Sequence, residues 1–112
     1  MNNTVQPQEI QQLTEALQKL RQKMVDDYNK SGFSLGYDVK FEFGRKFIKA
    51  IKCDGNGNSS SVVGFIVNTH NDKKFPFGTL LKAASWKAPA TNFSRGSVFE
   101  LDDLTIRWTG IQ

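Results

Sequence analysis

Residues 39–68 decide the fold, and they read VKFEFGRKFIKAIKCDGNGNSSSVVGFIVN. The opening VKFEF alternates apolar with charged residues, which is typical of a strand that buries one face. Gly44-Arg45 then interrupts the alternation as a short turn or bulge, and residues 46–53 predict a second strand. The first half of the stretch therefore predicts two neighbouring strands.

The second half of the stretch predicts a hairpin. The sequence DGNGN at residues 54–58 is the strongest turn signal in the chain, because Gly and Asn enter the backbone conformations of tight hairpin loops at little cost. Residues 61–68 are apolar on both faces, as in a central strand. Gly64 inside this strand predicts a bulge or a close backbone approach.

Shorter elements follow. Residues 69–78 predict a polar loop, residues 79–84 a short strand, and residues 104–108 a last strand. Preceded by a helix over residues 8–28, these strands predict an α+β fold, in which an N-terminal amphipathic helix is followed by a four- to five-stranded antiparallel sheet. The expected organisation is a single domain over residues 1–112, with its sheet core at residues 37–109.

The helix is predicted from apolar residues at spacings of three and four. These residues are Ile10, Leu13, Leu17, Leu20 and Met24. Pro7 suits the first helical position, and residues 29–32 contain the polar residues and glycine that end a helix. The apolar stripe is narrow, so two interpretations stay open: the helix packs on its own sheet, or these five residues form an oligomer interface with a second subunit.

Composition excludes several classes of protein. Cys53 is the single cysteine, so no internal disulfide is expected and a reducing compartment is the simplest interpretation. His70 and Cys53 leave no pair for a common zinc site or a Cys/His dyad. No run reaches 18 apolar residues, and the N-terminus is too polar for a secretory signal, so no membrane partner is expected.

Positive charge is concentrated in the middle of the chain. Residues 37–99 contain ten Lys and Arg side chains against four carboxylates. Such a region attracts phosphates, although solubilising lysines on a small domain give the same count. One group of candidate phosphate ligands lies at the Gly44-Arg45 turn and on the predicted second strand: Arg45, Lys46, Lys49 and Lys52. Lys49 has the opposite strand parity from Lys46 and Lys52, so a single basic face is not implied, and edge-strand lysines need no ligand.

The segment LKAASWKAPATNFSRG at residues 81–96 is the strongest candidate site. It places Trp86 among Lys82, Lys87 and Arg95, with small alanines around the indole. An indole face stacks on a nucleobase for about 1–3 kcal/mol, and flanking cations neutralise phosphate. The alternative is that Trp86 belongs to the core and the lysines are a solvated edge.

Catalysis and metal binding have little support. Ser85, Ser94 and Ser97 have His70 as their one conventional base, and His70 falls in the polar loop. Glu100 with the following Asp102-Asp103 pair is more typical of a solvated face or a turn than of a metal site. The glycines have neither phosphate-loop nor dinucleotide-binding spacing. The sequence therefore predicts a protein that is not an enzyme, with no catalytic residues, metal or cofactor.

The block KAASWKAP at residues 82–89, followed by Arg95-Gly96 and preceded by the strand–hairpin–strand core, resembles a family of short bacteriophage-encoded proteins. The resemblance runs from about Phe43 to Phe99, half of the chain. Many members have a shorter loop where this chain has residues 69–78, and the C-terminal end departs from their pattern. The family is similar to the anti-Thoeris sponges, non-enzymatic phage proteins that sequester cyclic ADP-ribose-type messengers and in some cases cyclic oligonucleotides.

This resemblance implies a counter-defence protein of the host cytoplasm that binds a small cyclic nucleotide at a subunit interface of a homo-oligomer. Trp86 or Phe65 would stack on the base, and Phe75 and Phe77 would cap the pocket. The expected polar contacts are Lys82, Lys87, Arg95 and Arg45 to the phosphates, with a hydrogen bond from Ser85.

Two other functions stay open. The same aromatic and basic side chains along an open sheet face would suit a single-stranded nucleic-acid-binding protein. A small structural or assembly protein of the phage needs no ligand at all.

Overall fold

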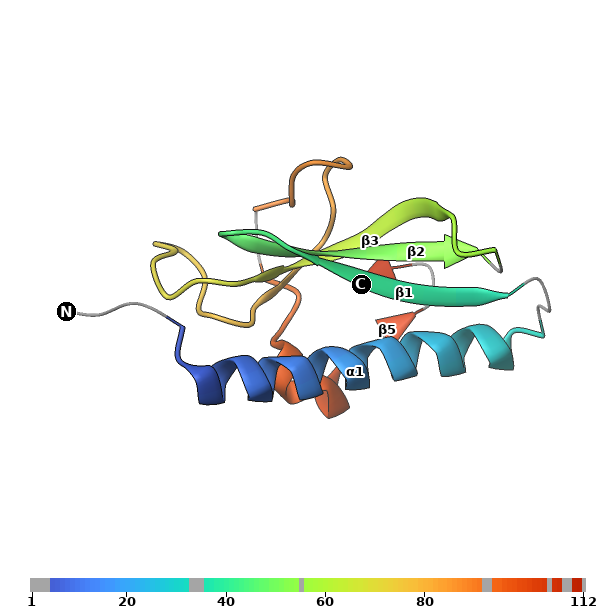
Figure 1. The fold of residues 1–112 in the computed structure, drawn as a ribbon, viewed down its shortest axis with the longest axis horizontal. Helices are drawn as coiled ribbons and strands as arrows, with labels where there is room; N and C mark the ends of the chain where they lie inside the picture. The colour runs from blue at the N-terminus through green and yellow to red at the C-terminus, as the bar shows by residue number, and fades with distance from the viewer. Residues whose placement is uncertain are drawn as a thin grey trace.

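The computed structural model describes residues 5–32, 36–54, 56–91, 94–104, 106–107 and 110–111. Helix α1 (Pro7–Lys30) lies lengthwise along one face of the sheet (Figure 1). Pro7 occupies the first helical position, and Glu9 Oε1 accepts the Gln6 N–H at 2.9 Å, which satisfies one of the free amides at the helix start. The predicted helix is confirmed and extends slightly beyond both expected ends.

The main sheet has four antiparallel strands in the order β1-β2-β3-β4. Their bounds are β1 (Tyr37–Phe43), β2 (Phe47–Asp54), β3 (Ser59–Val67) and β4 (Leu80–Leu81). The α+β fold predicted from the sequence is confirmed. Asp54 Oδ1 accepts the N–H groups of Asn56 and Asn58 in the hairpin between β2 and β3, so the DGNGN turn lies where the sequence predicted it.

A bulge beside Gly64 shifts the alternation of side chains along β3. Ala50 pairs with Gly64, but Ile51 pairs with Val62, so Val63 is the extra residue on β3. The extra residue shifts the alternation, and Val63 and Ile66 both contribute to the cluster beneath α1 although they are three apart. The irregularity predicted at Gly64 is therefore present.

The sheet separates two apolar clusters. The larger one lies between the sheet and α1, and the smaller one covers the other side, which we call the outer face. Buried residues of the smaller cluster are Phe65, Val67, Phe75 and Leu81. Neighbouring residues of β3 and β4 therefore serve opposite sides, as the two-residue period of a strand requires.

The apolar stripe of α1 packs against the sheet of the same chain. Leu13, Leu17, Leu20 and Met24 are each at most 2% exposed and belong to the cluster between α1 and the sheet, whereas Ile10 is 48% exposed. Of the two interpretations, the helix packs on its own sheet. This corrects the expectation of an oligomer interface at those four positions, because their side chains are not accessible to a second subunit.

The C-terminal region differs from expectation. A 3-10 helix, η1 (Val98–Asp103), which the sequence did not predict, packs against α1 and buries Val98 and Leu101. Glu100 and Asp102 are exposed on it, which agrees with the solvated face expected for these acids. The strand predicted at 104–108 is the short β5 (Ile106–Arg107), which pairs with β6 (Gly110–Ile111) and not with the main sheet. Leu104 instead caps the end of η1, and residues 105 and 108 of that prediction lie outside the described residues.

Two further features bear on the classes of protein considered. Cys53 is buried on β2, which agrees with a small strand residue. Within the described ranges, no helix combines the length and apolar character needed to cross a membrane.

Candidate functional site

The candidate site lies on the outer face, where residues 82–91 rise away from α1 (Figure 1). These residues form a small hairpin: Ala90 N–H donates to Lys82 O at 2.7 Å, and Ala84 N–H donates to Ala88 O at 3.0 Å. The segment leaves β4 because its backbone pairs with itself, which is why β4 is shorter than predicted.

The tip of this hairpin, which we call the Ser85–Ala88 turn, presents Trp86 and Lys87. Ser85 Oγ accepts the N–H groups of Lys87 at 3.3 Å and Ala88 at 3.2 Å. Ser85 therefore shapes the turn, a local role that competes with the ligand contact predicted for it. Trp86 is 46% exposed, so the interpretation of Trp86 as a core aromatic is wrong.

A basic hollow of about 320 Å³ lies beside this turn and opens to solvent. Arg45, Lys46, Lys49 and Lys87 line it, with Glu42 as the one carboxylate among the lining residues. Its remaining lining residues are Phe43, Gly44, Phe47 and Phe65. Four cations against one anion over an apolar floor favour an anionic ligand with a planar or apolar part.

The turn that carries Arg45 is held to the sheet by three hydrogen bonds. Gly44 N–H donates to Phe47 O at 2.9 Å, and Asn68 Nδ2 donates to Gly44 O at 3.0 Å. Asn68 also donates its backbone N–H to Lys46 O at 2.7 Å. The basic hollow is thereby bordered by backbone whose position is set by β2 and the end of β3.

Lys49 connects the hollow to the tryptophan. Its Nζ lies 5.1 Å from the centroid of the Trp86 ring, within cation–π range. On the sheet, Lys49 pairs with Glu42 of β1 and Phe65 of β3. The parity argument separated Lys49 from Lys46 and Lys52, and the sequence did not place Lys49 beside Trp86. Pairing of Lys49 with Phe65 would have placed Lys49 on the outer face. That pairing could not be predicted, because it depends on the strand register on either side of the bulge.

The three phenylalanines predicted to contact a ligand have other roles. Phe65 is 2% and Phe75 is 7% exposed, so both are core residues of the outer face, and neither offers a free ring to a base. Phe77 packs on the other side of the sheet, against His70 at 4.8 Å and Phe99 at 5.8 Å between ring centroids. These predictions are corrected because the rings of Phe65 and Phe75 are buried in the outer cluster and the ring of Phe77 packs on the α1 side.

The predicted phosphate contacts divide into two groups. Arg45 and Lys87 line the basic hollow. Lys82 is exposed and Arg95 is half-buried, and neither lines the hollow or the open depression of about 330 Å³ that Trp86 and Ser85 border. Arg95 instead lies in a segment that extends the sheet beyond β4, with its N–H donating to Leu80 O at 2.8 Å.

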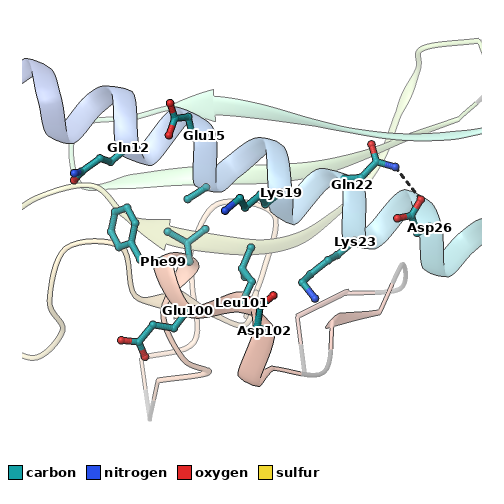
Figure 2. Close-up of a pocket in the computed structure, with 12 residues that line it drawn as sticks. Gln12, Glu15, Lys19, Gln22, Lys23, Asp26, Phe99, Glu100, Leu101 and Asp102 are labelled. Atoms are coloured by element: carbon teal, nitrogen blue, oxygen red, sulfur yellow. Dashed lines mark hydrogen bonds between the residues drawn. The ribbon is translucent and has the colours of Figure 1, made fainter.

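A second hollow, of about 380 Å³, lies between α1 and η1 (Figure 2). Lys19 and Lys23 extend from α1, and Glu100 and Asp102 come from η1. Glu15 and Asp26 add two more carboxylates, and Asp26 accepts a hydrogen bond from Gln22 at 2.8 Å. Because carboxylates outnumber lysines, this hollow is a poorer phosphate site than the outer face.

Side chains that could act as a general base or bind a metal ion are dispersed among the described residues. His70 Nε2 lies 2.8 Å from Glu9 Oε2 at the start of α1, away from the Ser85–Ala88 turn. Among the described residues, no three His, Cys, Asp or Glu side chains gather in a way that could hold a metal ion.

The shifted pKa values belong to structural contacts. The hydrogen bond from Arg21 lowers the pKa of Asp38, and burial raises the pKa of Tyr37. The N–H groups of Lys74 and Phe75 lower the pKa of Asp72 in loop 69–78. These shifts result from contacts between α1 and β1 and within loop 69–78, and none of these three groups lines the basic hollow.

The comparison with protein families identifies one match. The matching family model covers residues 3–106 and is described as a family of unknown function (DUF7717). No curated protein and no solved structure matches the chain.

Proposed function

Since the chain belongs to the family of unknown function DUF7717, whose description names no activity, we propose from its surface chemistry that it binds a nucleotide on the outer face without chemical turnover. The carrying observation is the exposed Trp86 beside a hollow lined by four cations. The base stacks on the indole, and Arg45, Lys49 and Lys87 hold the phosphates.

The ligand proposed first is a small cyclic nucleotide signal, which the protein sequesters as a phage counter-defence factor in the host cytoplasm. Sequestration without catalysis is supported by the site's composition, because the basic hollow and the Ser85–Ala88 turn bring no histidine or carboxylate pair together. The hollow is open, so a second copy that covers the outer face would enclose the ligand. The proposed subunit contact is therefore this face and not the buried stripe of α1.

Single-stranded nucleic acid is the second candidate. The observation in its favour is the openness of the outer face, where Phe43, 57% exposed, borders the basic hollow. A chain of nucleotides could pass from Trp86 toward Phe43 over the cations. Such binding weakens steeply with salt because many counterions are released, whereas a ligand with two phosphates loses much less.

The test is thermal denaturation at low and high salt with cyclic ADP-ribose isomers, cyclic di- and trinucleotides, and oligo-dT. A ligand that binds the native state raises the melting temperature. We expect one cyclic nucleotide to stabilise the protein at both salt concentrations and to be recovered intact by chromatography. Stabilisation by oligo-dT alone, lost at high salt, would support the second candidate. No shift with any ligand would leave a structural protein.

Matched variants locate the binding. Trp86→Ala and Lys87→Gln should weaken ligand binding by about 10-fold or more each. Their controls are Phe99→Ala, an exposed aromatic on the α1 side, and Lys19→Gln, an exposed lysine of α1. Each melting temperature shift is measured against the same variant without ligand. Equal losses in the controls would contradict binding on the outer face.

A further inference from the structure

The contact between Lys49 and Trp86 has a consequence for ligand choice. The ammonium group takes up part of the indole surface, 5.1 Å from the ring centroid. The same side chain lines the basic hollow together with Arg45 and Lys87. One cation therefore serves both the proposed base position and the proposed phosphate position.

We infer that Lys49 couples the two halves of the site, so that anion binding in the basic hollow increases the affinity of Trp86 for a base. This inference rests on the proposed function and deepens it, because it selects a ligand that carries a phosphate and a planar base together. In the free protein, Lys49 competes with a base for the indole. A phosphate draws the ammonium group into the hollow and releases the ring.

The positions around Lys49 support this exchange. Its neighbours across the strands are Glu42 and the buried Phe65, and the side chain is half-buried on the sheet. Three phenylalanines and three further cations line the same hollow. Arg45, Lys46 and Lys87 repel the Lys49 ammonium group and Glu42 attracts it, so the hollow repels the ammonium on balance and the indole offers it a neighbouring site. A bound anion reverses this balance by neutralising the hollow.

The coupling has an expected size. A cation–π contact at an exposed site is worth about 0.5–1 kcal/mol, which corresponds to about a two- to five-fold change in affinity. By reciprocity, a base and an anion that bind separately must raise each other's affinity by the same factor. Inorganic pyrophosphate and adenosine are the two probes, because each supplies one half of a nucleotide.

The experiment uses the full chain with Trp108→Phe, which leaves Trp86 as the single tryptophan. Adenosine is titrated against Trp86 fluorescence with and without saturating pyrophosphate. We expect pyrophosphate to raise adenosine affinity about two- to five-fold. In Lys49→Met, adenosine should bind at the raised affinity already, pyrophosphate should bind about 10-fold or more weakly, and the coupling should vanish. Lys40→Met is the matched control, since it removes the same charge from β1 at an exposed position outside the hollow.

The outcomes separate the two proposals. If both probes bind but pyrophosphate leaves adenosine affinity unchanged, the coupling is overturned and nucleotide binding stands. The same conclusion follows if Lys49→Met keeps the coupling, or if it weakens adenosine binding as a loss of structure would. If neither probe perturbs Trp86 or binds by calorimetry, both proposals fall.

Discussion

At the scale of single residues, Gly78 shows how a backbone conformation positions a side chain far along the sequence. Gly78 has φ +88°, a left-handed conformation that glycine adopts most readily. A Cβ atom at this position would overlap the ring of Phe99. Gly78 O also accepts the N–H of Val98 at 2.8 Å. The end of loop 69–78 therefore requires a glycine at position 78, because η1 packs closely against it.

We predict that Gly78→Ala destabilises the fold by more than the left-handed backbone alone explains. The conformational cost for a residue with Cβ is about 1–2 kcal/mol, and the overlap with Phe99 adds to it. Gly57→Ala is the control, because Gly57 has φ +82° with open space around its Cβ position. Urea denaturation measures both variants. Equal losses of unfolding free energy would mean that the Phe99 ring moves aside at no cost.

At the scale of elements, the contact between α1 and β1 combines a polar and an aromatic pair. Arg21 Nε donates to Asp38 Oδ1 at 2.6 Å, and the rings of Tyr28 and Tyr37 stack at 4.9 Å between centroids. The sequence predicted both elements because each has a regular apolar period. It did not predict this pairing, because which helical turn meets which strand residue depends on the crossing of α1 over the sheet.

The Asp38 contact predicts a pH dependence of stability. Arg21 lowers the pKa of Asp38 in the folded state, so the stabilisation is present above the unfolded-state pKa and is lost as pH falls through the folded-state pKa. Both side chains are partly exposed, so the contribution is below about 1 kcal/mol.

We therefore expect Asp38→Asn to lower stability at neutral pH and to reduce the fall in unfolding free energy between about pH 6 and pH 2. Part of the fall should remain, because Asp72 also has a lowered pKa. Asp102→Asn, at an exposed position on η1, is the matched control. Denaturant unfolding across the pH range measures all three proteins. The same pH profile for Asp38→Asn and the unmodified protein would contradict the assignment.

At the scale of the whole molecule, β3 belongs to both apolar clusters. Val63 and Ile66 pack toward α1, and Phe65 and Val67 pack on the outer face. The loss of either cluster exposes the central strand to water and removes the support of the other. The two sides of the sheet should therefore not unfold independently.

This sharing predicts a single unfolding transition. In the Trp108→Phe protein, Trp86 fluorescence reports on the outer face and far-ultraviolet circular dichroism reports mainly on α1. We expect the two denaturation curves to have the same midpoint and slope. Phe65→Ala removes a buried ring from the outer face and should lower the free energy of unfolding by about 3–5 kcal/mol. Both denaturation curves should shift to the same lower midpoint. A fluorescence transition that precedes the loss of helix would show that the outer cluster unfolds separately.

The sequence by itself determined the features that depend on local or periodic patterns. The spacing of apolar residues in α1, the alternation in β1 and the DGNGN turn specified the elements and the α+β fold, because each depends on neighbours within a few residues. The sequence also singled out Trp86, Lys87 and Arg45, since an aromatic residue among cations is visible without a fold.

The tertiary structure decided which of these residues meet. The bulge beside Gly64 set which residues of β3 share a face, and the folding of residues 82–91 over the sheet brought Trp86 to Lys49, although a count of alternate positions had separated Lys49 from the neighbouring lysines. Tertiary packing also placed the apolar residues of α1 against the sheet and the ring of Phe77 on the α1 side. These outcomes depend on register and on packing between distant segments, and a one-residue shift in a strand moves every following side chain to the other face.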